Sequence, residues 1–211
     1  MQNKLYVYEK ALESRVVAIM RKFDVTKVVP LARALYEGGI RAMEVTMDTV
    51  GATGAITAIR NELGDKIAVG AGTVLDGEIA RIAILAGAQF LVTPNLNLDV
   101  VTVGNRYGVP AMPGVMTPTE IQQACAAGVD IVKVFPAGVL GPAFIKSIKG
   151  PLSHVAVMAT GGISVDNAAD FRKVGADLLG VGGNLVSAKL VAENRFDEIT
   201  AYAKQLVETA R

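Results

Sequence analysis

The chain has 211 residues, a formal net charge of +1, one histidine, one cysteine and no tryptophan. Its length fits one domain over residues 1–211, and with 51% hydrophobic and 19% charged residues it is a folding sequence rather than a disordered one. These counts exclude an intrachain disulfide and the usual zinc site, and a near-neutral chain has no general attraction for nucleic acid or for an anionic membrane.

The sequence offers no segment that reads as a membrane span or a signal peptide. The longest uncharged run, about residues 82–98, is interrupted by Gly87 and Pro94, whereas a spanning helix needs about 20 consecutive apolar residues. The N-terminus carries charged residues instead of an apolar segment. We therefore expect a cytoplasmic protein.

Eight short runs of apolar, often β-branched residues are predicted as strands, with helical stretches between them. Glycine steps such as Gly38-Gly39-Ile40 are typical of helix ends that lead into the next strand. The expected strands are Val16–Met20, Ala42–Thr46, Ile67–Ala71, Phe90–Thr93, Ala111–Pro113, Ile131–Phe135, Val155–Ala159 and Leu178–Val181. The clearest predicted helices are Thr26–Glu37, Thr119–Ala127 and Arg195–Thr209.

Short, almost wholly apolar strands are typical of a parallel sheet that is covered by helices. Eight βα units in a chain of this length predict an α/β protein with a small (β/α)₈ barrel, the TIM barrel. A doubly wound open sheet is the alternative, but it needs a glycine-rich fingerprint after the first strand. Arg21-Lys22-Phe23-Asp24 stands there instead, so the pattern favours the barrel.

Functional residues of such barrels gather at the C-terminal ends of the strands. Polar or conformationally special residues stand at these ends: Arg21, Glu44 with Thr46, Thr73, Pro94, Pro113, Lys133 with Phe135, Thr160, and Gly182-Gly183.

Lys133 is the most informative of them, because it stands inside the apolar strand Ile131–Phe135. Both faces of a barrel strand are covered, so the lysine is expected to be buried, and desolvation lowers its pKa and frees a neutral amine to attack a carbonyl. Glu44, in Ala42–Thr46, is its natural partner as an ion-pairing group or as a general acid/base. The structural alternatives are a snorkelling lysine and a buried ion pair without catalytic role.

Two glycine-rich steps follow the last two predicted strands. Backbone amides in these loops, together with the next helix N-terminus, form the common phosphate site of barrels. Nucleotide-binding motifs are absent, so we expect a small phosphorylated ligand. Arg21 could hold an anion, and Thr73 could donate a hydroxyl. The two steps are Thr160-Gly161-Gly162-Ile163-Ser164 and Gly180-Val181-Gly182-Gly183-Asn184.

Taken together, several segments resemble one known family in order and spacing. They are Val16 to Arg21, Glu44-Val45-Thr46, Gly70 to Val74, Pro113 to Glu120, Lys133-Val134-Phe135-Pro136 and Thr160 to Ile163. The combination covers almost the whole chain and resembles the 2-keto-3-deoxy-6-phosphogluconate (KDPG) and 4-hydroxy-2-oxoglutarate (KHG) aldolases. This resemblance implies a (β/α)₈ barrel, a homotrimer, and metal-independent class I aldolase chemistry on a 2-keto acid without a cofactor.

The resemblance also implies roles. Lys133 matches the Schiff-base lysine and Glu44 the general acid/base. Phe135 matches a residue that packs beside the lysine. At the pyruvate end the matching residues are Thr73 and Pro94, and at the phosphate end they are Thr160, Gly161, Gly162, Gly182 and Gly183.

Three positions depart from the pattern of many members. Asp48 stands where many have an arginine that helps to hold the substrate carboxylate, so Arg21 is the candidate for that role here. Asn184 replaces a serine that contacts phosphate, and Ala159 replaces a proline. These departures leave open a related 2-keto-3-deoxy sugar acid such as the phosphogalactonate. A phosphosugar isomerase or synthase, or a non-catalytic phosphosugar-binding barrel, remains an alternative that would not use Lys133 as a nucleophile.

Overall fold

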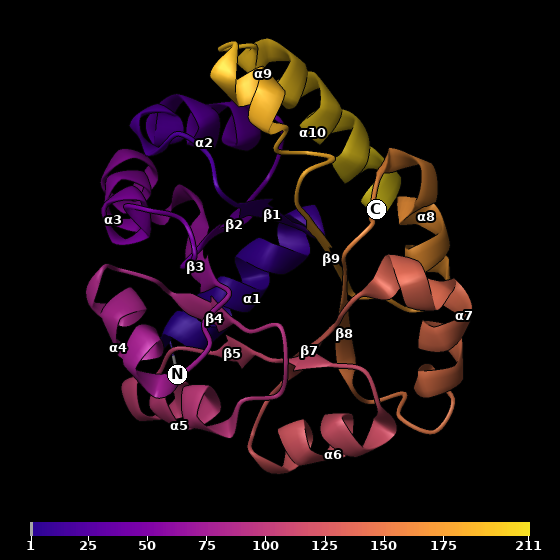
Figure 1. Ribbon diagram of the computed structural model, residues 1–211. Helices are drawn as coiled ribbons and strands as arrows, with labels where there is room; N and C mark the ends of the chain where they lie inside the picture. Colours follow the sequence, from indigo (N-terminus) through magenta and orange to yellow (C-terminus); the bar gives the residue numbers. More distant parts are fainter. Residues whose placement is uncertain (1) are drawn as a thin grey trace.

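The computed structural model describes residues 2–211 and has a ring of strands at its centre, surrounded by helices (Figure 1). Each hydrogen-bonded pair of strands is parallel, in the order β5-β4-β3-β2-β1-β9-β8-β7-β6. The predicted barrel is therefore confirmed. The strands are β1 Val16–Met20, β2 Ala42–Thr46, β3 Ala68–Gly72, β4 Phe90–Val92, β5 Ala111–Met112, β6 Gly114–Val115, β7 Ile131–Val134, β8 Ala156–Thr160 and β9 Leu178–Val181.

The fifth predicted strand is divided in two by Pro113. Its first half, β5, pairs with β4, and its second half, β6, pairs with β7, so the ring closes through this one stretch of chain. Proline has no N–H to give to the ladder, which explains the interruption. Its carbonyl still accepts a hydrogen bond from the N–H of Lys133 at 2.8 Å. The predicted strands at 67–71 and 155–159 each lie one residue further along the chain.

The outer layer consists of helices that follow the strands in turn. They are α2 Val28–Glu37, α3 Ala52–Leu63, α4 Gly77–Leu85, α5 Leu98–Tyr107, α6 Pro118–Ala126, α7 Ala137–Lys149, α8 Val165–Lys173, α9 Ala188–Ala192 and α10 Phe196–Ala210, with the 3₁₀ turns η1 Val25–Lys27 and η2 Gly64–Lys66. The three helices predicted from the sequence correspond to η1 with α2, to α6 and to α10. Among residues 2–211, no helix has both the length and the apolar character needed to cross a membrane.

The strands bury apolar side chains on both faces, as the composition predicted. Outward-pointing residues such as Met43 and Val132 pack against the helices, whereas Val17, Phe90 and Leu178 fill the barrel interior. Because the interior near the strand starts is filled by apolar groups, the polar interior residues are confined to the C-terminal half of the strands.

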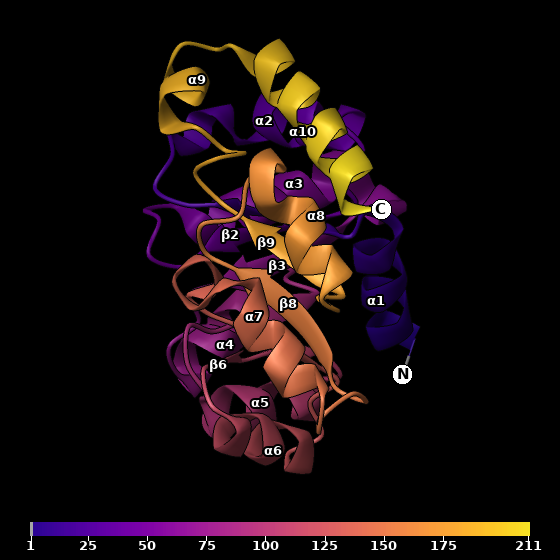
Figure 2. The same ribbon diagram turned by 90° about the vertical axis from the view of Figure 1, so that its right-hand side faces the viewer.

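A helix that the sequence analysis did not predict, α1 Gln2–Ser14, closes the N-terminal end of the barrel (Figures 1 and 2). Val7 and Ala11 join the interior cluster. The Tyr6 hydroxyl donates to the carbonyl of Ile67 at 2.6 Å, which fastens the helix to the start of a strand. Figure 2 shows α1 on one side of the barrel and the loops around α9 on the other.

Candidate active site at the C-terminal mouth

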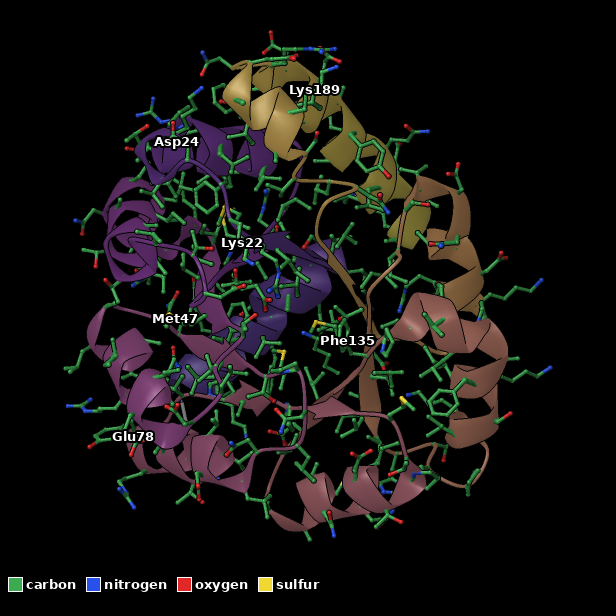
Figure 3. All side chains as sticks on the ribbon, viewed as in Figure 1. Lys22, Asp24, Met47, Glu78, Phe135 and Lys189 are labelled. Atoms are coloured by element: carbon green, nitrogen blue, oxygen red, sulfur yellow. The ribbon has the colours of Figure 1, made fainter. Side chains whose placement is uncertain are left out.

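A cavity of about 320 Å³ lies at the C-terminal mouth of the barrel. Ten of the twelve residues predicted to form the site line it, and Ile19 and Ile163, which were not predicted, line it as well. The predicted residues that line the cavity are Arg21, Pro94, Lys133, Phe135, Thr160, Gly161, Gly162, Gly182, Gly183 and Asn184. Glu44 and Thr73 do not line the cavity. Thr73 accepts a hydrogen bond from Arg21, and the charge of Glu44 acts on Lys133, and both Arg21 and Lys133 line the cavity. Figure 3 places Phe135 close to the centre of this view, whereas Asp24, Glu78 and Lys189 lie over the outer helices.

Lys133 extends from β7 into the barrel and is only 5% exposed. Its Nζ lies 5.1 Å from the centroid of the Phe135 ring. Burial lowers the pKa of this lysine, the negative charge of Glu44 opposes the shift, and the positive charge of Arg21 adds to it. The amine therefore loses its proton more readily than an exposed lysine does, which is what a nucleophilic amine requires.

Glu44 lies on β2 and is 1% exposed. Its Oε2 is buried without a hydrogen-bond partner among the residues that the structure describes. Burial raises the pKa of Glu44, and the positive charges of Lys133 and Arg21 counteract this. On β3, Gly72 leaves the space that the carboxylate occupies, because a Cβ there would collide with Glu44 Oε1.

The structural alternative for these two groups was a buried ion pair. Within residues 2–211, the structure records no ion pair between Glu44 and Lys133. A buried carboxylate and a buried amine that are not paired with each other are costly to stability, and such groups are characteristic of functional sites.

Arg21 follows β1 and contacts the ends of the next two strands. Its Nη1 donates to Asp48 Oδ2 at 2.9 Å, and its Nη2 donates to Thr73 Oγ1 at 2.8 Å. Burial alone would raise the pKa of Asp48, but the Thr46 hydroxyl and the charges of Arg21 and Lys22 hold it below its usual value. Asp48, which the sequence left unexplained, is thus an ionised partner of the arginine at the mouth.

The opposite end of the cavity is formed by the two glycine-rich loops. Gly161 and Gly162 have φ angles of +93° and +75°, a conformation that other residues rarely adopt. Asn184 joins the loops, since its Nδ2 donates to the Ile163 carbonyl at 2.8 Å. The Thr160 hydroxyl is buried beside them without a partner in the described part of the chain. The side chains lining this end are uncharged, and helix α8 begins just beyond them.

Sequence reasoning missed three features of this site. Ile19 lines the cavity because it lies two residues before Arg21 and shares its inward direction, a signal that period-two alternation could have supplied. Ile163 lines the cavity from the glycine-rich loop that follows β8. The contact between Asp48 and Arg21 depends on the turn after β2 and had no signal in the sequence.

Over residues 2–211, no group of three or more His, Cys, Asp or Glu side chains is placed to hold a metal ion. His154 lies exposed in the turn before β8, at the end of the barrel away from the cavity, and Cys125 is half-buried in α6.

The profile described as "KDPG and KHG aldolase" matches residues 7–202, and the chain belongs to this aldolase family. It is 41% identical to the 2-dehydro-3-deoxy-phosphogluconate aldolase of Treponema pallidum over 96% of each chain. It is 32% identical to the 2-dehydro-3-deoxy-6-phosphogalactonate aldolase of Escherichia coli, over 92% of this chain and 96% of the relative.

Solved structures give the same assignment. The KDPG aldolase of Legionella pneumophila, with pyruvate captured as a covalent carbinolamine, superposes with a TM-score of 0.86 at 26% identity, over 98% of each chain. A 3-hexulose-6-phosphate synthase superposes with a TM-score of 0.72 at 18% identity, over 93% of this chain and 99% of that chain, which shows a shared fold alone.

Proposed function

We propose that this chain is a single-domain class I aldolase. It cleaves KDPG to pyruvate and glyceraldehyde 3-phosphate, or KHG to pyruvate and glyoxylate, or both. The observation that carries this proposal is the buried, unpaired amine of Lys133 in a cavity at the mouth, with the buried carboxylate of Glu44 acting on it. The family membership of the chain supports the same reaction.

In the first step the neutral amine of Lys133 attacks the C2 carbonyl of the substrate. A proton moves to the carbonyl oxygen, and loss of water from the resulting carbinolamine gives an iminium. The positive iminium accepts the electron pair that the later bond cleavage releases, so the reaction needs no metal. The lowered pKa of Lys133 supplies the neutral amine for this attack.

In the second step Glu44, acting through a water, accepts the proton of the C4 hydroxyl. The C3–C4 bond breaks, its electron pair moves to the iminium, and an aldehyde and an enamine result. Protonation of the enamine at C3 and hydrolysis then release pyruvate and restore Lys133. The raised pKa of Glu44 suits a group that takes up a proton and gives it back.

The remaining residues bind the two ends of the substrate. Arg21 binds the C1 carboxylate, with Pro94 and Thr73 at the same end. Phe135 packs over the lysine. The glycine loops bind the phosphate through backbone N–H groups at the end where α8 begins, and Thr160 lies at the same end of the cavity.

A borohydride experiment tests the reaction class. The protein is incubated with pyruvate, reduced, digested and analysed by mass spectrometry. An adduct confined to the peptide that contains Lys133 is expected. If no adduct formed, the aldolase proposal would be overturned and a phosphosugar isomerase or synthase would be favoured. The 3-hexulose-6-phosphate synthase shares only its fold with this chain.

Substrate choice is tested separately. Cleavage rates are compared for KDPG, its phosphogalactonate counterpart and KHG, which has no phosphate. We expect the phosphorylated substrates to be cleaved more efficiently. If KHG were cleaved as well as they are, the phosphate site would be wrong. The phosphogalactonate is included because one relative is named for it.

The proposal includes a homotrimer, which the family resemblance implies, and a cytoplasmic location, which follows from the composition of the sequence. Light scattering should then give a mass three times the 22.0 kDa of one chain. A mass of one chain would contradict it.

A further inference from the structure

Asp48 contacts the cavity only through Arg21. The arginine lines the cavity, whereas neither of its two hydrogen-bond acceptors, Asp48 Oδ2 at 2.9 Å and Thr73 Oγ1 at 2.8 Å, belongs to a residue of the lining. A guanidinium carries more N–H donors than these two bonds use, so others remain for a ligand in the cavity. The two acceptors belong to the segments that follow β2 and β3, so Arg21 is held from two neighbouring strand ends.

Asp48 is itself held in place by a short turn. The N–H of Met47 donates to the Gly72 carbonyl at 2.8 Å, and the N–H of Thr49 donates to the Thr46 carbonyl at 2.9 Å. The Thr49 hydroxyl accepts from the N–H of Lys22 at 2.9 Å, which ties the turn to the end of β1. The carboxylate therefore projects from a turn that is fastened to the strands on both sides.

Thr73 has a φ of +54°, which a β-branched residue adopts only at a cost in free energy. The strained conformation places the hydroxyl where Arg21 donates to it. Strain of this kind persists only where the surroundings enforce it, and it gathers at functional sites.

We propose that Asp48 is a positioning residue. With Thr73 as a second anchor, it fixes Arg21 so that the free N–H groups of the guanidinium meet the carboxylate of the 2-keto acid. This inference rests on the proposed function, since it assigns the substrate carboxylate to Arg21. It also explains why a carboxylate stands at the mouth of a cavity that binds anions: Asp48 neutralises part of the charge of Arg21 and Lys22 while orienting the guanidinium.

The test compares two ligands of the same carbon skeleton, one with a charged carboxylate and one with a neutral amide at C1. Pyruvate and its neutral amide, pyruvamide, are each titrated in the borohydride trapping reaction, and the concentration giving half-maximal adduct on Lys133 is measured. In Asp48→Ala we expect this concentration to rise about three- to tenfold for pyruvate and to stay unchanged for pyruvamide. Asp48→Asn keeps an oxygen that accepts from Arg21, and it should recover part of the affinity for pyruvate.

Glu62→Ala is the matched control. Glu62 accepts from Arg33 at 2.6 Å, so this variant also removes one side of an arginine–carboxylate pair, but it does so between α2 and α3, away from the cavity. It should leave both titrations unchanged.

Each other outcome overturns the proposal. A lower half-maximal concentration of pyruvate in Asp48→Ala would mean that Asp48 competes with the substrate for Arg21. An equal rise for both ligands would mean a general structural role, and unchanged titrations in both Asp48 variants would mean that Arg21 needs no support. A failure of the proposed function looks different, because the unsubstituted protein would then form no adduct with pyruvate at any concentration.

Discussion

Glu44 on β2 and Lys133 on β7 act on each other across the barrel interior, from strands that are separated in the sheet by β1, β9 and β8. Burial shifts the pKa of each toward its neutral form, and the charge of the other group opposes that shift. No ion pair joins them in the described chain, so neither charge is neutralised by direct contact with the other.

Replacing the lysine should abolish covalent trapping. Lys133→Arg keeps a positive charge but cannot form an iminium, so we expect no pyruvate adduct and a loss of cleavage on the order of 10³-fold or more. Adduct mass and cleavage rate are the measurements. Lys22, which is exposed near the same mouth (Figure 3), is an internal control, because it lies outside the cavity and should stay unmodified. An adduct on Lys22 in the unsubstituted protein would contradict the proposed selectivity.

Replacing the carboxylate should separate bond cleavage from iminium formation. Glu44→Gln keeps the shape of the side chain, so the amide fits beside Gly72. The turnover number for cleavage should fall on the order of 10²- to 10⁴-fold, the usual contribution of a general acid/base. Borohydride should still trap pyruvate on Lys133. A variant that cleaves normally would exclude Glu44 from the proton transfer.

The raised pKa of Glu44 predicts that the free energy of unfolding depends on pH, and the same variant tests this. The pKa of Glu44 is raised above its ordinary value of 4.5, so the folded protein binds a proton more tightly than the unfolded chain does. The stability that this group contributes is complete below about pH 4.5 and is lost as the pH rises through the folded-state pKa. Relative to the unsubstituted protein, Glu44→Gln should therefore gain stability between acidic and neutral pH. Urea unfolding at several pH values measures the difference, and a difference that does not change with pH would refute the shift.

The space that Gly72 leaves should be essential. In Gly72→Ala the new Cβ meets the Glu44 carboxylate, so the carboxylate must move, activity should fall, and the free energy of unfolding should drop by about 1–3 kcal/mol. Gly54→Ala is the matched control, since a Cβ at this position of α3 has no neighbour within 4 Å. That variant should gain roughly 0.5–1 kcal/mol with full activity. Equal behaviour of the two variants would contradict the close packing at Gly72.

The unpaired Thr160 hydroxyl should serve the substrate rather than the fold. Thr160→Val replaces a buried hydroxyl that has no partner among residues 2–211, so the variant should be as stable as the parent protein or gain about 1 kcal/mol. Cleavage efficiency should fall, because the variant lacks a polar group that the proposal places at the phosphate end of the cavity. Thermal unfolding and the specificity constant kcat/KM are the measurements. A loss of stability without a change in kcat/KM would assign Thr160 to the fold.

Much of this architecture was predictable, because barrel strands carry a strong signal. The apolar runs located the ring, and the covering of both faces of its strands predicted that Lys133 would be buried, as it is. The rule that sites lie at strand C-termini then gathered residues that are far apart in the sequence, and most of them line one cavity. The roles assigned to these residues stay predictions until the experiments above are done.

Other features depend on tertiary contacts that leave little trace in the sequence. Helix α1 is held by bonds such as that from Tyr6 to the Ile67 carbonyl, which only the folded barrel provides. The split at Pro113 depends on which neighbours each half of the strand meets. Asp48 reaches Arg21 only because the turn after β2 is fastened to two adjacent strands.

Helix α1 also constrains the order of events in catalysis. It closes the end of the barrel opposite the cavity, so substrates enter and both products leave through the same mouth (Figure 2). In the proposed mechanism, the three-carbon fragment remains attached to Lys133 after the C3–C4 bond breaks, whereas the aldehyde is free. The aldehyde therefore departs first and pyruvate last, and in the reverse direction pyruvate must be loaded before the aldehyde can react.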